Sequence, residues 1–298
     1  MRKVSIGLIV MAALAVSVSS PAVTVLKLTF DSAATVDEAT YVFAPADIPA
    51  SGTVSIHFNH PYVASERDYG LEVCSASDTT NYPDIVTPAT ASTWQGGNAL
   101  YTNMGTSGDP CKHIGYYINE DNGIAIDGDF TAEAVFMMTQ LNPNGAEHGL
   151  QNIFGNDKVI DATRGLCGWK FRIWPENYLV LPQGVGQIQL WTPNTVAFTG
   201  ENNIDGPTVT PGVWHHVACV YNSTTNTMEM FYDGTSAGTT TPVYGDTKQN
   251  QWWVGDWPSN CAPRQLAGWI DAVALSDTTL TPAQFKLQAG NVEQWKEY

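Results

Sequence analysis

The chain has 298 residues, of which 43% are hydrophobic and 14% are charged, and its formal net charge is −16. An acidic field of this size repels nucleic acid and anionic lipid, so neither is expected as a partner. The low charge content, with 26 Gly, 17 Pro and 10 Trp, favours turn-rich β structure over helix bundles. The length suffices for one large β domain or two ordinary ones.

The first residues have the features of an export signal. Residues 1–3 are Met-Arg-Lys, residues 6–16 are apolar but too short to span a membrane, and residues 20–22 are Ser-Pro-Ala. We predict that residues 1–22 are a signal peptide; an uncleaved membrane anchor is the alternative. Because no second long apolar run occurs, we expect no membrane insertion after cleavage and a secreted protein, extracellular or at the cell surface.

Short β-like segments follow the leader. In the first half we predict strands within residues 23–30, 40–44, 53–58 and 98–103, and long loops in the Pro-, Ser- and Thr-rich stretch 59–93. From Gly123 onwards the predicted strands are 130–139, 151–154, 168–174, 187–191, 214–221, 227–232, 252–254 and 266–275. This spacing indicates a two-sheet sandwich or a barrel and not βαβ units. A separate small N-terminal domain ending near Gly123 is the alternative to a single domain.

Two segments carry specific local signals. The apolar runs 214–221 and 227–232 enclose a polar turn, and Asp233-Gly234 follows the second run. Asp-Gly favours the two positive φ angles of a type I′ turn, so we predict that a third strand folds straight back. Near the C-terminus, residues 281–284 read Thr-Pro-Ala-Gln, a capping box with Pro at the first helical position, which predicts a short helix from about Pro282.

Several motifs occur in an order that is typical of one superfamily. They are residues 28–31 (Leu-Thr-Phe-Asp), 97–100 (Gly-Asn-Ala-Leu), 130–136, 212–218 (Gly-Val-Trp-His-His-Val-Ala), 231–234 (Phe-Tyr-Asp-Gly), 254–256, 266–275 and 280–285. In this order they resemble the laminin G-like domains of the concanavalin A-like lectin/glucanase superfamily. The resemblance implies that residues 23–298 form one domain with long N-terminal loops, an all-β, two-sheet antiparallel jelly roll with a short C-terminal helix.

The motif of a catalytic relative is missing. Enzymes of this superfamily that cleave β-glucans carry Glu-x-Asp-x-x-Glu on one strand, whose alternate residues share a face. Glu72, Glu133, Glu201 and Glu229 each lack a carboxylate two residues further on. We therefore predict a non-catalytic protein that binds a glycan or a cell-surface or matrix partner. A glycoside hydrolase or lyase of the same fold, with carboxylates from separate strands, and a purely structural surface component are the alternatives.

Tryptophans are the candidate ligand contacts, because sugar rings stack their C–H faces on indoles. Any single Trp in a sandwich is more often part of the core. Trp252 and Trp253 are neighbours in a predicted strand and face opposite sides, so one of them must be exposed or covered by a loop. Trp257 follows on a loop, where binding residues concentrate. We predict Trp252, Trp253 and Trp257 as ligand-binding residues.

Calcium is the candidate metal, because its hard oxygen ligands suit an acidic exported chain. The resemblance implies a structural Ca²⁺ where the first strand meets the last, and the matching positions are Asp31 and Asp271. The alternative for Asp271 is an ordinary hydrogen-bonded carboxylate. His215 and His216 are strand neighbours that face opposite sides, so they cannot bind one ion together. We predict that both have structural roles in the packing of the sheet. Asp233 is explained by its turn.

Five cysteines are present, and no Cys-x-x-Cys pair occurs. Cys219 lies in an apolar strand and is predicted to be a buried thiol. Cys74, Cys111, Cys167 and Cys261 lie in turn-rich segments and suffice for two disulfides. Of the three pairings we favour Cys74–Cys111 with Cys167–Cys261, although the sequence does not decide between them.

Overall fold

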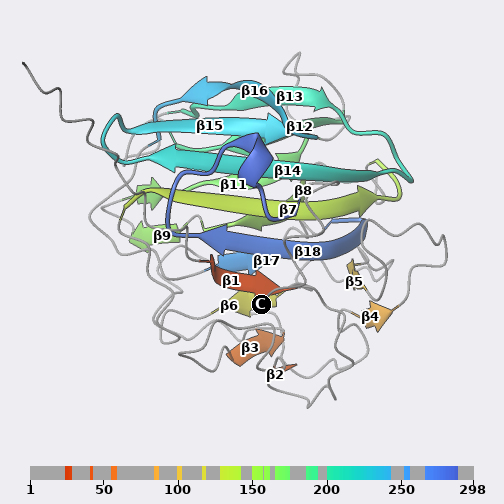
Figure 1. Cartoon of the computed structure of the whole chain (residues 1–298). Helices are drawn as coiled ribbons and strands as arrows, with labels where there is room; N and C mark the ends of the chain where they lie inside the picture. The colour runs from red at the N-terminus through yellow and green to blue at the C-terminus, as the bar shows by residue number, and fades with distance from the viewer. Residues whose placement is uncertain are drawn as a thin grey trace, which may run out of the picture.

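The computed structural model describes residues 24–28, 41–42, 55–58, 84–86, 99–102, 116–118, 128–141, 150–156, 158–161, 165–174, 186–193, 200–242, 252–255 and 266–287. These residues form two large antiparallel sheets, packed face to face, as Figure 1 shows. The predicted two-sheet jelly roll is therefore confirmed. No helix of the described part of the chain is long and apolar enough to cross a membrane.

The first sheet lies towards the viewer in Figure 1. Its strand order is β16 (Thr235–Thr240), β15 (Thr227–Tyr232), β14 (Trp214–Asn222), β7 (Phe130–Met138), β18 (Gly268–Ser276), β5 (Ala99–Thr102) and β4 (Asp84–Val86), and β1 (Thr24–Leu28) also pairs with β18. Strands from both ends of the sequence therefore meet at β18. The assignment of residues 1–22 to a signal peptide and of 23–298 to one domain stays a prediction.

The second sheet lies behind the first. Its order is β13 (Ile204–Thr208), β12 (Gln187–Trp191), β11 (Lys170–Ile173), β8 (Gln151–Gly155), β17 (Trp252–Val254), β6 (Tyr116–Ile118), β3 (Ser55–Phe58) and β2 (Tyr41–Val42). A separate hairpin joins β9 (Lys158–Asp161) and β10 (Gly165–Cys167).

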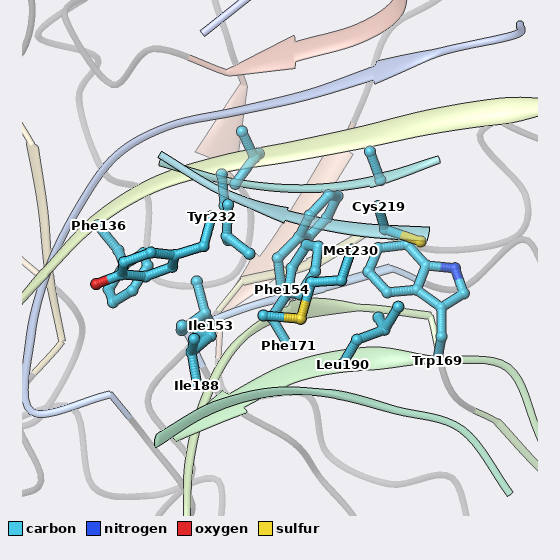
Figure 2. Close-up of a cluster of buried hydrophobic side chains, with 14 of the residues drawn as sticks. Phe136, Ile153, Phe154, Trp169, Phe171, Ile188, Leu190, Cys219, Met230 and Tyr232 are labelled. Carbon is cyan, nitrogen blue, oxygen red and sulfur yellow. The ribbon is translucent and has the colours of Figure 1, made fainter. Parts of the chain in front are cut away.

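The core lies between the sheets, and Figure 2 shows its aromatic centre. Trp169 is fully buried there, stacked on Phe130 and edge-on to Phe154 and Phe171. Burying a large apolar side chain contributes about 1.5–3 kcal/mol, so this cluster is a main source of stability. Cys219 is a buried free thiol in the same cluster, as predicted, and burial raises the pKa of the thiol well above its ordinary value.

The predicted meander is confirmed. Asp233 and Gly234 have φ angles of 47° and 76°, the two positive values that a type I′ turn requires. The chain consequently folds straight back, and β16 pairs with β15 from Met228 opposite Thr240 to Tyr232 opposite Thr235. β12, β15 and β17 have the same bounds as the strands predicted from the sequence.

The predicted C-terminal helix is only a single 3₁₀ turn, η5 (Pro282–Gln284). The N–H of Gln284 donates to the carbonyl of Thr281 at 2.8 Å, and the Gln284 side chain accepts the N–H of Thr281 at 3.0 Å. Beyond η5 the chain lies on the outer face of the first sheet, where Phe285 and Leu287 are fully buried. Tertiary docking of these side chains ends the helix after one turn.

Four segments that the sequence did not predict form strands: β4, β6, the β9–β10 hairpin and β13. β4 lies inside the stretch 59–93 that was predicted to be loops, so that prediction is wrong for Asp84–Val86. β13 contains Gly206 and Pro207, which read as turn residues. Pro is tolerated there because β13 is the edge strand of its sheet.

Candidate functional site

The outer face of the first sheet is covered by the protein's own C-terminal segment. Glu133 is fully buried on this face, and its carboxylate accepts the backbone N–H groups of Lys286 and Leu287, each at 2.9 Å. A third hydrogen bond, 3.0 Å long, joins it to Nε2 of His216. Leu287 packs on the small and apolar side chains around Val135. This part of the face is interior, so a ligand site must be sought elsewhere.

His215 and His216 face opposite sides of the first sheet, as predicted. His215 packs between Phe136 and Tyr232, with its ring 4.9 Å from the Tyr232 ring. Its Nδ1 lies 2.9 Å from Asp233 Oδ2, while Asp233 Oδ1 accepts the backbone N–H of His216 at 2.8 Å. The two histidines therefore have packing roles. Asp233 is the predicted turn residue, and it also fixes the start of β14.

The outer face of the second sheet is different, because charged and aromatic side chains alternate with core residues along β11 and β12. Phe171, Ile173, Ile188 and Leu190 point into the core. The intervening positions are Lys170 and Arg172 on β11, and Gln189 and Trp191 on β12. Cross-strand pairing places Lys170 opposite Trp191 and Arg172 opposite Gln189. We call these four residues, with Trp174, Glu201, Asn203 and Asp205, the polar–aromatic network.

Arg172 is the centre of this network. Its Nη2 donates to Glu201 Oε2 at 2.7 Å, and its Nη1 lies 3.5 Å from Oε1. Its Nε donates to Gln189 Oε1 at 2.9 Å, and the Gln189 amide in turn donates to Asp205. Asn203 donates to Glu201 Oε2 at 2.7 Å. Charge-assisted bonds of this forked kind fix the orientation of both partners.

Two indole rings lie beneath the cations. The Arg172 guanidinium is 4.7 Å from the ring centroid of Trp174 and 5.8 Å from that of Trp191. The Lys170 ammonium is 4.3 Å from the Trp191 ring centroid. Cations at such distances are attracted by the ring face. The contacts hold both indoles in fixed positions on the outer side of the sheet.

The network extends from a buried end to an exposed end. Lys170, Arg172, Gln189, Trp174 and Trp191 are all at most 3% exposed. Asp205 is exposed, and the Glu201 side chain keeps 28% of its surface. Burial disfavours ionisation of Glu201. The charge of Arg172 and hydrogen bonds from Arg172, Asn203 and Trp191 outweigh this effect and hold the pKa of the carboxyl below its ordinary value. The ion pair is therefore formed at neutral pH.

Two polar atoms beside the network have no hydrogen-bond partner among the described residues, Thr192 Oγ1 and Asn203 Oδ1. Both atoms are buried, and Thr192 directly follows Trp191. A buried acceptor without a partner costs free energy, so such atoms mark places where a ligand or water completes the structure.

The sequence model of the concanavalin A-like lectin/glucanases superfamily, of the laminin G type, matches residues 115–286, which is more than half of the chain. The chain belongs to this superfamily. The matched range contains the whole polar–aromatic network and the meander β14–β16. No curated protein sequence matches the chain.

Three solved structures are similar to this chain at low identity. Domain 4 of AbnA, a GH43 extracellular arabinanase from Geobacillus stearothermophilus in complex with arabinotriose, is 16% identical with a TM-score of 0.49, covering 88% of this chain and 96% of that one. The Ruminococcus gnavus IT-sialidase CBM40 is 14% identical with a TM-score of 0.45, covering 61% and 91%. A Trypanosoma rangeli sialidase in complex with sialic acid is 12% identical with a TM-score of 0.48, covering 87% of this chain. The chain spans only 33% of that sialidase.

The predicted ligand tryptophans lie partly within the described residues. Trp257 lies outside them, and Trp252 and Trp253 form the start of β17, in the same sheet as the network. Trp253 pairs with Gly155 of β8, and Gly155 pairs with Lys170. The register therefore places position 253 in one cross-strand row with Lys170 and Trp191. At Gly155 a side chain has no room, because a Cβ would lie 2.6 Å from the Trp169 carbonyl oxygen.

Two residues, Asp31 and Asp271, were predicted to bind calcium, and Asp31 lies outside the described residues. Asp271 is buried in β18 at an irregularity of the ladder, where Ile270 and Ala272 pair with successive residues of β7 and Asp271 is passed over. A bulge of this kind re-aims a side chain. Within the described ranges no group of three or more His, Cys, Asp or Glu side chains is placed to hold a metal ion. Calcium binding stays a prediction.

The proposed disulfides also stay predictions. Cys74, Cys111 and Cys261 lie outside the described residues. Cys167 is the last residue of β10, where its backbone pairs with Lys158 of β9.

Sequence reasoning missed most of the network. Trp174 and Trp191 belong to the Trp-rich second half, but Arg172, Glu201 and Asp205 were not connected with them. The usable signal was the alternation in Lys-Phe-Arg-Ile and Gln-Ile-Gln-Leu-Trp, which places cations, an amide and an indole on one face of adjacent strands.

Proposed function

We propose that the protein is an exported, non-catalytic carbohydrate-binding protein whose binding surface is the outer face of β11–β13. The observation that carries this proposal is the polar–aromatic network, in which indoles and forked polar side chains are held together in one fixed arrangement. A sugar presents apolar C–H faces and a ring of hydroxyl groups that both donate and accept. Small-ligand sites typically combine aromatic surfaces with a few placed polar groups in this way.

The roles follow from the position of each group. Trp191 and Trp174, each 2% exposed, form the buried end of the network, where their rings support Lys170 and Arg172. The exposed end, which a ligand meets first, carries the carboxylates of Glu201 and Asp205, held in place by Arg172 and Gln189. Asn203 and the neighbouring Thr192 offer acceptors that lack a protein partner among the described residues. We also propose that Trp253, the member of the Trp252–Trp253 pair that lies in the cross-strand row of Trp191, extends the surface, and that Trp257 contributes from the loop that follows.

Binding without cleavage is supported by the state of the carboxylates. A glycosidase needs one carboxylic acid with a raised pKa to protonate the leaving group. Glu201 has a lowered pKa because Arg172 is paired with it. Glu133, the carboxylate at the centre of the first sheet, is buried and bound to the C-terminal segment. Neither is suited to be a general acid.

The proposal predicts saturable binding to oligosaccharides that weakens in Asn203→Ala. Purified mature protein would be applied to a glycan array that includes arabinotriose and sialyllactose, and affinities would be measured by calorimetry. Asn203→Ala removes one half-buried amide and should weaken binding about five- to tenfold, the effect of one hydrogen bond. Thr239→Ala on exposed β16 of the other sheet is the matched control and should bind like wild type.

Two results would contradict this function. If no glycan binds, a purely structural role at the cell surface fits the protein better. If reducing ends appear when the protein is incubated with the bound glycan, the protein is a hydrolase of the same fold.

We further propose that Asp271, with Asp31, holds a structural calcium ion. The support is the buried carboxylate at the ladder irregularity and the pairing of β1 with β18, in which Leu28 lies opposite Val273. Hard oxygen ligands are those that Ca²⁺ prefers, and a bound ion stabilises the folded state. Thermal melting should therefore shift to lower temperature in chelator and return with added Ca²⁺. Identical melting curves in the two conditions would exclude the ion.

A further inference from the structure

We infer that the network selects neutral glycans and disfavours glycans that carry a carboxylate, such as sialylated or uronic-acid sugars. The inference rests on the proposed function and names the ligand class of that same surface. It depends on how the charges of the network are paired and on the order in which an incoming ligand meets them.

The described network has balanced charges. Lys170 and Arg172 are its cations, and Glu201 and Asp205 are its carboxylates. Arg172 is the group that a sugar carboxylate would need, because a guanidinium binds a carboxylate through two parallel hydrogen bonds. Its two Nη atoms already lie against the two oxygens of Glu201, and its Nε donates to Gln189. A sugar carboxylate would have to displace Glu201 from this pair.

The charges also have a spatial order. The cations are at the buried end, with Lys170 2% and Arg172 3% exposed, whereas Asp205 is exposed and Glu201 is partly so. An anionic sugar therefore meets carboxylates before it meets a cation. The repulsion is reinforced by the formal charge of −16 on the whole chain.

Neutral sugars meet no such barrier. An ionised carboxylate is an acceptor only, and a sugar hydroxyl donates to it. The side-chain carbonyl oxygen of Asn203, which has no partner among the described residues, is buried beside Glu201 and adds an acceptor for a hydroxyl that enters the network. The exposed end of the network is therefore rich in acceptors, which suits a ligand with many hydroxyl donors and no charge.

The test compares pairs of glycans that differ only in an acidic sugar, for example lactose and 3′-sialyllactose, on an array and by calorimetry. Wild-type protein should bind the neutral member of each recognised pair at least about tenfold more tightly at low salt. Asp205→Asn removes one exposed charge and keeps an acceptor oxygen. It should lower the ratio of neutral-glycan affinity to acidic-glycan affinity about threefold or more. The change should diminish at high salt, because screening weakens the repulsion.

Glu229→Gln is the matched control, since it removes the same charge from β15 of the first sheet, where Glu229 accepts a hydrogen bond from Ser236. It should leave the preference unchanged. Tighter binding of the acidic members, or equal effects of the two substitutions, would overturn the inference while the carbohydrate-binding function stands. Failure to bind any member of any pair would overturn both.

Discussion

Replacing Glu133 by alanine is expected to destabilise the protein by about 3–5 kcal/mol, because it breaks a buried hydrogen-bonded network and leaves its three partners unpaired. Glu133 is fully buried, and its carboxylate accepts hydrogen bonds from Lys286 and Leu287 and contacts His216. Without it, two backbone N–H groups and an imidazole nitrogen lose their acceptor in a place without solvent. Urea unfolding followed by tryptophan fluorescence measures the change in the free energy of unfolding.

The same substitution should release the C-terminal segment. Phe285 and Leu287 are held on the sheet by apolar packing and by the two hydrogen bonds to Glu133. Limited proteolysis should therefore remove the C-terminus of Glu133→Ala faster than that of wild type. Glu133→Gln should have a smaller effect, because the side-chain carbonyl oxygen of Gln still accepts one of the two backbone N–H groups. The remaining cost arises because the NH₂ group of Gln then faces the other backbone N–H, which loses its acceptor. Glu229→Ala on β15 is the control for a half-buried carboxylate and should change stability by less than about 1 kcal/mol.

Equal stability and equal proteolysis of Glu133→Ala and Glu229→Ala would contradict the view that this face is closed by the C-terminal segment. In that case the outer face of the first sheet would be open to a ligand, and the choice of the second sheet as the binding surface would lose its main support.

Replacing Gly268 by alanine is expected to cost about 3 kcal/mol or more, because the new methyl group would collide with backbone. Gly268 begins β18 and lies opposite both Met138 of β7 and Thr102 of β5. A Cβ there would be 2.0 Å from the Met137 carbonyl oxygen, and the next nearest atoms, at 3.0 Å, are also backbone. A rotamer change cannot relieve this contact, so the central pair β7–β18 must separate. Urea unfolding again measures the effect.

Gly128→Ala is the matched control for this prediction. An added Cβ at Gly128 meets no atom within 4 Å, and the residue lies two positions before the same strand, β7. The substitution should be neutral or stabilise by up to about 1 kcal/mol, since it restricts the unfolded chain. If the two variants unfold at the same urea concentration, the close approach of β7 and β18 at Gly268 is wrong.

Features that depend on local chemistry were predictable from the sequence. Asp233 and Gly234 readily adopt the positive φ angles of a type I′ turn, so their order in the sequence predicts that turn. The alternation of apolar and polar residues before the turn predicts the bounds of β15. The opposite orientations of His215 and His216 follow from the pleat alone. The spacing of the predicted strands indicated a sandwich or a barrel, and the resemblance to laminin G-like domains implied the two-sheet jelly roll.

Features that depend on tertiary neighbours were not predictable. The capping box at Thr281 is present, but Phe285 and Leu287 bury themselves on the first sheet and end the helix after η5. β13 contains Gly206 and Pro207, and only its position at the edge of a sheet makes a strand acceptable there.

The network was missed for the same reason. Arg172 and Glu201 are separated by 29 residues, and Gln189 and Asp205 by 16, so their partnership depends on the strand order β13-β12-β11. The candidates found from sequence were those with a local signal, the Trp252–Trp253 pair above all. They belong to the same sheet, which the sequence did not reveal.

The central claim is that the outer face of β11–β13 binds carbohydrate, and the indole N–H resonances of ¹⁵N-labelled protein test it most directly. The protein would be titrated with a panel of neutral oligosaccharides that includes arabinotriose, and the Trp191 resonance would be assigned with Trp191→Phe. Trp169 is an internal reference, because it belongs to the core between the sheets, whereas Trp191 and Trp174 belong to the network on the outer side of the second sheet. We predict that the Trp191 and Trp174 resonances shift saturably with one dissociation constant while Trp169 does not move. Saturable binding that leaves the Trp191 and Trp174 resonances unmoved, or no binding at all, would contradict the claim.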